Sequence, residues 1–516
     1  MSEMSNGAVI VPSGGACARH HPGLIAVGII ISILLTQWAI HVDGIINNDG
    51  VHYILTAEHI AAGEWKEAFE TFKWPAYSFL IAQVQMVTGV GFENAAHIVT
   101  TIGFTLAVLG FVCVVHALGG RQRVLWLALA VAFVYPGINE FRSYLIRDSI
   151  FLACYLFALS SFIRYAYHPA LSQLLIGTLL LIMAALFRVE SVALLCLIPV
   201  WLASGVGTRA PHPLLLLGYL VVALPLVTLF YCWWVYRPDD VSAITDIFTD
   251  PWQFITLAFE QLGAEITTHD AVGQHISTSE LLSALGITLW IVLKATIEAI
   301  SVPFALILCL EAWRRRLFFG STEPVRRLIV SIIIVHIVIL VIFAFAKSFL
   351  APRYPVALAM TLVLAVPFAL DRYITHWGQM ESGLRRGLQI TLVAFFMGVN
   401  LVEGLNNYTD KTYLKDAGHW FRKHVAADAR IASNDMKFVF YANRYAEKWV
   451  AFRDKKEFLE FLTSDQWMFK DYLAINVRRK DKGLMQLIDE NLHQKPIKRF
   501  DSDKGDFLLV YYTGDD

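Results

Sequence analysis

Charged residues are scarce in this sequence. Asp, Glu, Lys and Arg make up 16% of its 516 residues, whereas 56% are hydrophobic, and the mean hydropathy is +0.54. Soluble domains have about a quarter of their residues charged, so an ordinary soluble protein is excluded and a polytopic membrane protein is indicated. The net charge of −1 gives no basis for nucleic-acid binding, and we expect none.

Cysteine is also scarce, and nucleotide-binding motifs are missing. The six cysteines form no CxxC pair, so neither a zinc site nor a disulfide framework is indicated, and they are expected to be small buried side chains. No Gly-rich phosphate loop or GxGxxG fingerprint stands between a strand-like and a helix-like run. A lipid-linked ligand is therefore favoured over a soluble nucleotide, and no cofactor is expected.

Apolar runs, by contrast, are abundant. A spanning helix needs about 20 mostly apolar residues, and eleven runs reach or approach that length. We therefore expect a mainly α-helical membrane domain at 24–404 with about eleven transmembrane helices, after a flexible cytoplasmic leader at 1–23. No clear small-residue cleavage pattern follows the first run, which indicates a retained anchor. The predicted spans are 24–42, 93–118, 123–137, 147–166, 170–188, 190–204, 213–235, 286–311, 327–347, 353–371 and 386–404.

The loops between these runs differ in charge. With the N-terminus inside, every inner loop carries Arg, as in WRRRLFFGSTEPVRR, whereas the large outer loop 237–285 has Arg237 as its single Lys or Arg and is rich in acids. The positive-inside rule therefore fixes this orientation, with a cytoplasmic N-terminus and an outer C-terminus.

Two outer segments have structure of their own. In the first outer loop, 43–92, apolar residues recur at helical spacing, and the short apolar stretch 75–91 is expected to be an interfacial or re-entrant helix. In the last segment, 405–516, charge rises, and β-like runs such as DYLAINV alternate with helix-like runs such as GLMQLIDENL. This alternation predicts a small soluble α/β domain on the outer side.

Ionisable residues in or beside spans are costly and therefore indicate function. Here they gather on the outer side and combine several cations with carboxylates. Cations would hold a lipid-borne phosphate and stabilise it as a leaving group, and a carboxylate would deprotonate an incoming hydroxyl or amine. The candidates are Asp49, Lys73, Arg142, Arg147, Asp148, Arg188, Glu190, Lys294, Glu298, Lys347 and Arg353.

Five motifs follow one another along the outer side. They are NNDGVHY after the first span, AAGEWKEAFETFKWPAYSFLIA, RDSIFLACYLFAL at the start of a span, LFRVES at a tight turn, and the late KSFLAPRYPVALAM. Their order, over nearly the full length, resembles the GT-C class of polytopic glycosyltransferases, in particular the protein O-mannosyltransferases and the bacterial lipid A aminoarabinose transferases. The mannosyltransferases carry an acidic pair in the first loop, whereas Gly50 follows Asp49 here, which favours the bacterial relatives.

The resemblance implies an activity and roles for individual residues. It implies inverting transfer of a sugar from a polyprenyl-phosphate donor to a lipid, polysaccharide or protein acceptor, at the periplasmic face of a bacterial inner membrane, by a chain that we expect to be monomeric. Asp49 would be the catalytic base and Asp148 a second acid. Lys73 would contact the donor phosphate, and Arg353 and Tyr354 would lie near it.

Several candidates have structural alternatives. Asp49 in NNDG also suits a turn. Asp148 could cap its helix or pair with Arg147, which is a further donor-phosphate candidate. Arg188 and Glu190 flank a tight turn, where a structural ion pair competes with donor binding.

The remaining candidates are similarly open. Lys294 is four residues from Glu298, so pairing within one helix is favoured over phosphate contact. Lys347, like Arg353, could anchor the end of a span instead of binding phosphate. His52 and Tyr53, in the first outer loop, suit packing or acceptor contact.

Two broader alternatives remain. The histidines of loop 237–285 lack tight ligand spacing, so no metal site is predicted, although the acidity of this loop keeps a divalent metal open. A flippase for lipid-linked saccharides would use a similar polar chamber. The lack of internal repeats and of paired broken helices favours the transferase.

Overall fold

The chain forms two compact units, described here one at a time. The first unit comprises residues 1–33, 102–141 and 147–406, and the second comprises 34–101, 142–146 and 407–516. The predicted span 213–235 and the loop 237–277 lie outside the described residues. The computed structural model describes residues 21–204, 278–314, 317, 321–347, 349–378, 383–405, 410–444, 449–450, 460–461, 463–464, 470–492 and 494–513.

The first unit is built from apolar helices. Among the described residues, six helices of the chain are long and apolar enough to cross a membrane, or seven if the bent pair α15–α16 is one span. The chain is therefore a mainly α-helical, multi-pass membrane protein, as predicted, and the full count of eleven spans stays a prediction. The helices with residues in this unit are α2 (Pro22–Asp43), α6 (Phe92–Ala117), α7 (Gln122–Val134), α8 (Pro136–Asn139), α9 (Asp148–Tyr167), α10 (Leu171–Ala185), α11 (Glu190–Ala203), α15 (Thr278–Ile300), α16 (Val302–Trp313), α17 (Glu323–Lys347), α18 (Val356–Val363), α19 (Val366–Gly378) and α20 (Gly383–Leu405).

One predicted span is broken. Residues 286–311 form parts of α15 and α16, which meet at an angle of 105° instead of continuing as one helix. Ser301, between them, has φ +74° and ψ 148°, and Pro303 is in the first turn of α16. If the helix continued through this point, the proline ring would clash with the carbonyl of Ala299, so Pro303 disfavours a continuous helix here.

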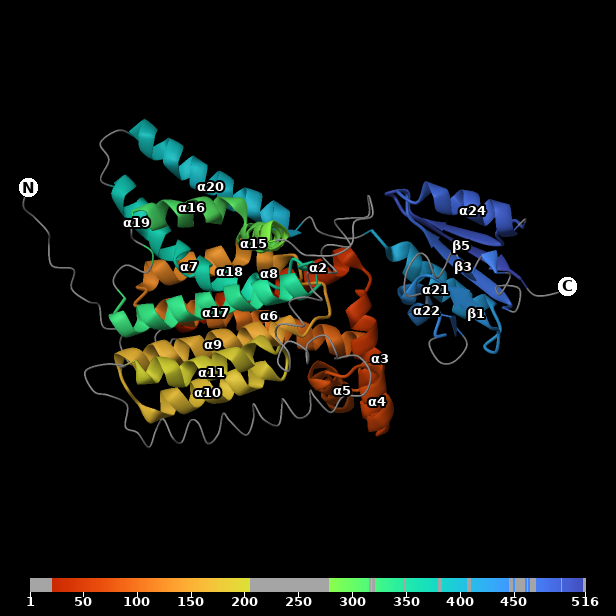
Figure 1. Ribbon diagram of the computed structural model, residues 1–516, viewed down its shortest axis with the longest axis horizontal. Helices are drawn as coiled ribbons and strands as arrows, with labels where there is room; N and C mark the ends of the chain where they lie inside the picture. The colour runs from red at the N-terminus through yellow and green to blue at the C-terminus, as the bar shows by residue number, and fades with distance from the viewer. Residues whose placement is uncertain are drawn as a thin grey trace, which may run out of the picture. The chain divides into compact units, whose positions relative to one another are not determined.

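The helices α9, α10 and α11 lie side by side (Figure 1). Gly177 of α10 allows a close approach to α9, because a Cβ there would lie 2.8 Å from Phe162. The indole of Trp201 on α11 donates a hydrogen bond to the carbonyl of Pro324 at the start of α17 (3.0 Å). This packing fixes the ends of the three helices, from which the candidate site is built.

Apolar side chains also cover the outside of the first unit. Large hydrophobic residues are exposed on several of its helices, for example Val200 on α11 and Leu306 on α16. Cys196 and Cys309 are exposed on the same two helices, so the expectation that the cysteines are buried is wrong for this pair. An apolar outer surface of this kind is what a lipid-facing bundle requires.

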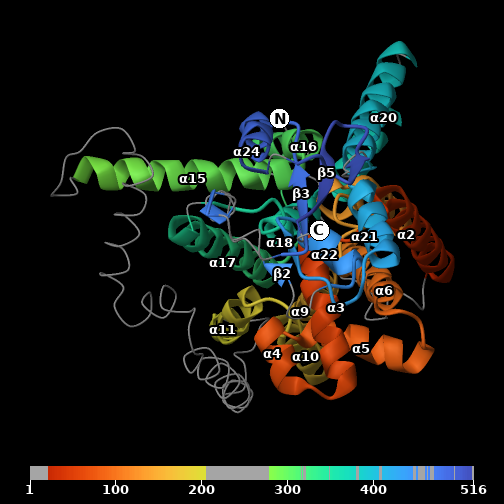
Figure 2. The same ribbon diagram turned by 90° about the vertical axis from the view of Figure 1, so that its right-hand side faces the viewer.

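In the second unit, the first outer loop folds into three helices. These are α3 (Asn48–Ala62), α4 (Trp65–Thr71) and α5 (Ala76–Thr88), and α3 packs against the other two (Figures 1 and 2). The predicted helical periodicity is present, because α3 buries Val51, Ile54 and Ala57 on one face. Gly63 ends the helix with φ +81°, a conformation that favours glycine.

The C-terminal segment forms a five-stranded sheet with helices, which confirms its predicted α/β character. The strand order is β2-β1-β3-β5-β4, with β1 parallel to β2 and β3, and β5 antiparallel to β3 and β4. The elements are α21 (Thr412–His424), β1 (Ile431–Ser433), α22 (Met436–Tyr441), β2 (Trp449–Val450), β3 (Tyr472–Val477), α24 (Lys482–Leu492), β4 (Lys498–Asp501) and β5 (Phe507–Tyr512).

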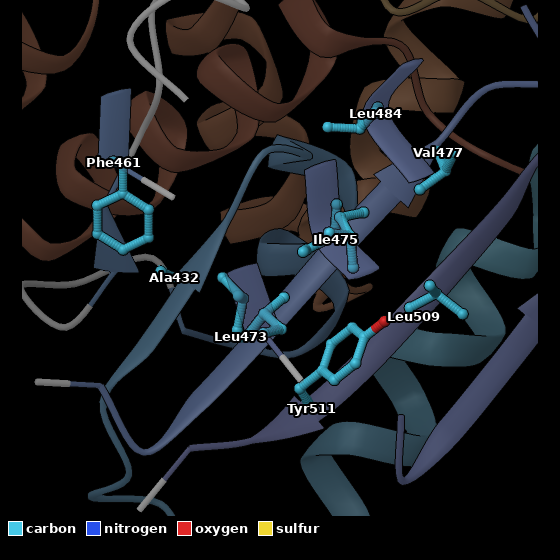
Figure 3. Packing of buried hydrophobic residues seen from close by; sticks show 10 residues of the cluster. Ala432, Phe461, Leu473, Ile475, Val477, Leu484, Leu509 and Tyr511 are labelled. Atoms are coloured by element: carbon cyan, nitrogen blue, oxygen red, sulfur yellow. The ribbon is translucent and has the colours of Figure 1, made fainter. Parts of the chain in front are cut away.

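Cross-strand pairs form the core of this sheet. Leu473 pairs with Tyr511 and Ile475 pairs with Leu509 across β3 and β5, and all four are buried. Figure 3 shows these side chains together with Leu484 of α24, which belongs to the same core. Period-two alternation places every second residue of a strand on one face, so these residues cover the face that α24 packs on.

The first outer loop and the C-terminal segment are bound to each other within this unit. The hydroxyl of Tyr441 on α22 accepts a hydrogen bond from the backbone N–H of Ile46 and donates one to Glu93, both at 3.3 Å. Lys415 of α21 forms an ion pair with the same Glu93 carboxylate (2.9 Å). Three buried or half-buried polar contacts thus join chain segments that are more than 300 residues apart in sequence.

Candidate functional site

Three predicted site residues of the first unit meet in one cluster, the Arg188 cluster. Asp148 is the first residue of α9, Glu190 is the first residue of α11, and Arg188 lies in the turn between α10 and α11. The Arg188 guanidinium donates through Nη1 to Asp148 and through Nη2 and Nε to Glu190, the Nε contact being 3.0 Å long. Only 7% of the Arg188 side chain is exposed. The ion pair of Arg188 with Glu190, one of the two alternatives that the sequence leaves open, is therefore present, and Asp148 also pairs with Arg188.

Two aromatic rings cover the Arg188 guanidinium. Its Cζ atom lies 5.5 Å from the ring centroid of Phe151 and 5.1 Å from that of Tyr354. A guanidinium within about 6 Å of a ring face is attracted by the π electrons. Phe343 in turn packs edge-on against Tyr354, with 4.7 Å between the ring centroids. The rings hold the charged group in a low-dielectric surrounding, where its electrostatic interactions are strong.

More positive charge surrounds the cluster. The Cζ atom of Arg353 lies 5.8 Å from the Tyr354 ring, and both Arg353 and Arg147 interact electrostatically with Asp148. The three arginines outnumber Asp148 and Glu190, so this region has a net positive charge. Arginine forks suit phosphate, which they bind with two parallel hydrogen bonds.

His336, in the middle of α17, belongs to the same region and is missing from the predicted site. It is buried, its ring packs edge-on against Tyr155 at 5.6 Å, and it interacts electrostatically with Glu190 and Arg188. Its Nε2 atom has no hydrogen-bond partner in the described part of the chain. The signal in the sequence is a single histidine within the apolar run SIIIVHIVILVIF, where a buried polar group is unusual.

A second group of predicted residues lies in the second unit, on or near α3. Asp49 is in the first turn of α3 and is half-buried. One turn later, burial lowers the pKa of His52, although the nearby Asp49 carboxylate raises it. Tyr53 is buried edge-to-face between Phe72 (5.0 Å) and Tyr77 (4.9 Å), so its contacts are those of a packing residue.

Close packing explains why glycine follows Asp49. A Cβ at Gly50 would lie 3.0 Å from the Cβ of Leu145 and 3.0 Å from Oδ1 of Asn47. The Asn47 side chain accepts a hydrogen bond from the Leu145 backbone N–H (2.8 Å) and donates one to its carbonyl (3.3 Å). This contact leaves little room for a second acidic side chain at position 50, so the departure from the mannosyltransferase pattern has a steric cause.

The remaining predicted residues are placed as follows. Lys73 is half-buried between α4 and α5. Lys294 forms the expected pair with Glu298 on α15 (3.7 Å), and both side chains are more than half exposed. The side chain of Lys347, at the end of α17, lies outside the described residues. Arg142 is fully buried in the second unit and donates a hydrogen bond to the Thr36 hydroxyl (2.8 Å).

Metal ligands do not gather in the described part of the chain. Within these residues, no three His, Cys, Asp or Glu side chains are close enough together to hold a metal ion. The histidines of the acidic loop 237–285 are not among the described residues.

In its fold, the chain is similar to the GT-C class of polytopic membrane glycosyltransferases. The structure of ArnT from Cupriavidus metallidurans in the apo state aligns with 96% of this chain and 99% of the ArnT chain, with 12% identity and a TM-score of 0.55. The structure of ArnT bound to undecaprenyl phosphate aligns with a TM-score of 0.53. The archaeal oligosaccharyltransferase AglB from Archaeoglobus fulgidus, in complex with an inhibitory peptide and a dolichol-phosphate, covers 93% of this chain and 72% of its own, with 11% identity and a TM-score of 0.51.

These similarities confirm the GT-C resemblance at the level of the fold. No protein-family model matches the sequence, and the comparison with curated proteins gives no significant match.

Proposed function

We propose that the protein transfers a sugar from a polyprenyl-phosphate donor to an acceptor on the periplasmic side of a bacterial inner membrane. The observation that carries the proposal is a buried arginine, Arg188, oriented by two carboxylates and covered by two aromatic rings, in a chain with the GT-C fold. A lipid-linked donor needs apolar surroundings for its tail and fixed cations for its phosphate, and the first unit has exposed apolar side chains and the arginines around Asp148.

The reaction is a single displacement at the anomeric carbon of the donor sugar. An acceptor hydroxyl or amine forms a bond to this carbon while the bond from the carbon to the phosphate oxygen breaks. The polyprenyl phosphate leaves with the bonding electrons, the acceptor proton passes to a base, and the anomeric configuration inverts. Asp49 is the proposed base, because a carboxylate at the start of the first outer loop matches the acid of the GT-C motif.

Arginines supply the charge that the leaving phosphate requires. Arg353 and Arg147 are the proposed phosphate contacts, because both interact electrostatically with Asp148 beside the Arg188 cluster. Asp148 and Glu190 are proposed to orient Arg188. This role fits Asp148 better than proton transfer, because its carboxylate already accepts a charged hydrogen bond. Lys73 remains a proposed phosphate contact by its place in the motif.

The substitution Asp49→Asn tests the base. Transfer from a radiolabelled polyprenyl-phosphate sugar is measured with the purified protein in detergent, where a flippase has no compartments to connect. We expect transfer to fall by about 10²- to 10⁴-fold while the variant still binds donor. Glu58→Gln, on the exposed side of the same helix, is the matched control and should keep full activity. Near-normal transfer by Asp49→Asn would refute the assignment.

A further inference from the structure

The C-terminal sheet has a switch point between β1 and β3. These two strands are adjacent and parallel, and the chain leaves β1 for β2 on one side but leaves β3 for β4 and β5 on the other. In sheets of this kind, ligands bind beyond the carboxyl ends of the two strands at which the connections diverge. A ligand of this sheet is therefore expected to bind beside the residues that follow β1 and end β3.

A network of neutral and acidic side chains holds this edge rigid. The Asn434 side chain bonds to both the N–H (2.7 Å) and the carbonyl (2.9 Å) of Asn476. The Asn476 amide donates to Asp435 (2.7 Å) and accepts from the Tyr413 hydroxyl (2.9 Å). Asp435 also accepts from the backbone N–H groups of the next helix, at 3.0 and 3.3 Å. Its carboxylate is thus engaged by three neutral donors.

Lys437 lies two residues after Asp435 and, unlike the side chains of this network, is positively charged. It is 92% buried, with 8% of its surface exposed. Its ammonium group nevertheless forms no hydrogen bond or ion pair with any residue that the structure describes, and burial lowers its pKa. A largely buried lysine whose ammonium group has no partner among the described residues is a candidate for binding an anion.

Two further cations stand near Lys437. Lys411, just before α21, and Arg478, just after β3, both interact with it electrostatically, as do the acids Asp435 and Asp43. Lys437 thus interacts electrostatically with two cations and two carboxylates, and one of these carboxylates, Asp435, is already engaged by neutral donors. Since lysine and arginine repel one another here, an oxyanion among them would relieve the repulsion and complete the hydrogen bonding of Lys437.

We propose that the carboxyl edge of β1 and β3 is a binding site for a phosphate or carboxylate group, held by Lys437, Lys411 and Arg478. The site belongs to the C-terminal segment and does not depend on the transfer reaction. The bound oxyanion could be carried by a soluble molecule or by a lipid headgroup, and the experiment below distinguishes these sources.

Thermal unfolding of the full chain in detergent, with and without inorganic phosphate, tests the proposal. A ligand that binds only the folded state raises its melting temperature. Wild type should be stabilised by phosphate, whereas Lys437→Met and Arg478→Gln should bind phosphate at least about tenfold more weakly. Lys423→Met removes a lysine from the exposed end of α21 and is the matched control, which should respond like wild type.

The variants separate binding from folding. Lys437→Met should unfold at a higher temperature than wild type without phosphate, because a largely buried lysine without a protein partner is gone, and yet gain little from phosphate. Arg478 is exposed, so Arg478→Gln should fold normally. If nanodiscs with phosphatidic acid suppress the phosphate effect and nanodiscs of phosphatidylcholine do not, the ligand is a lipid headgroup; if neither does, it is a soluble anion. No stabilisation of wild type, or equal stabilisation of both variants, would overturn the proposal.

Discussion

Arg188 is held by partners that lie both near and far in the sequence. Glu190 is two residues away, whereas Asp148 is 40 residues away and begins another helix. The motifs RDSIFLACYLFAL and LFRVES indicate charged residues at the ends of spans, but only the packing of α9 on α10 brings them together. This explains why the sequence predicts the pair of Arg188 with Glu190 and not its pair with Asp148.

Removing the arginine alone should destabilise the fold. Arg188→Met leaves two buried carboxylates without a counter-charge, and breaking a buried ion pair costs about 3–5 kcal/mol. Thermal or denaturant unfolding in detergent measures the loss. The triple variant with Asp148→Asn and Glu190→Gln removes all three charges and should recover most of the stability. A single variant as stable as wild type would show that the cluster is not buried in the way described.

Lys437 gives a prediction on pH. Burial and the nearby Lys411 lower its pKa from the ordinary value of 10.5 to about 8. The unfolded chain therefore binds more protons between these values, so folding is penalised below pH 8 and the penalty fades as pH rises towards 10.5. In phosphate-free buffer, Lys437→Met should stabilise the protein by up to roughly 3 kcal/mol near pH 7, and by much less near pH 10. A pH-independent difference would contradict this mechanism.

At the scale of elements, periodicity predicts helices better than their breaks. The spacing of apolar residues predicts α3 and α5, and the apolar runs predict α9 and α17, because burial of one face is a local property of the sequence. The break at Ser301 depends on one proline within an otherwise apolar run. The contacts of Asn434 with Asn476 depend on strand pairing between distant segments, which no local pattern reports.

The break between α15 and α16 stores backbone strain. Ser301 has φ +74° and ψ 148°, a region that is almost restricted to glycine, and its buried hydroxyl has no partner among the described residues. Ser301→Gly should therefore stabilise the protein by about 1 kcal/mol, measured by thermal unfolding. Ser301→Ala removes the hydroxyl and keeps the strain, so it should gain less. The reverse order of the two variants would mean that the hydroxyl, and not the backbone, carries the cost.

At the scale of the whole molecule, the order of motifs predicts the GT-C fold, although the identity with ArnT is only 12%. A fold of this size is kept by apolar spans, turns and a few buried charges, so short motifs in the right order can identify it while most positions vary. The individual contacts between the first outer loop and the C-terminal segment are not predicted. They rest on Tyr441, Glu93 and Lys415, which are ordinary polar residues until they are packed together.

Truncation after Leu405 should release the first outer loop. Loss of the C-terminal segment removes Tyr441 and Lys415, which bond to Ile46 and Glu93, and exposes the surface of α3 that packs on α22. Limited proteolysis followed by mass spectrometry should then find faster cleavage within 43–92. Cleavage in the turn at Gly120, which belongs to the first unit, is the internal control and should not change. Equal cleavage of 43–92 in both chains would contradict the coupling.

The Arg188 cluster also has a consequence for the making of the protein. Synthesis proceeds from the N-terminus, so Asp148 leaves the ribosome 40 residues before Arg188, and its carboxylate enters the membrane region with no partner from this cluster. Glu190 is synthesised two residues after Arg188, so the turn between α10 and α11 carries one positive and one negative charge. Arg188 therefore supplies the counter-charge of a carboxylate that is made 40 residues earlier, and its loss should reduce membrane insertion and yield before any activity can be measured.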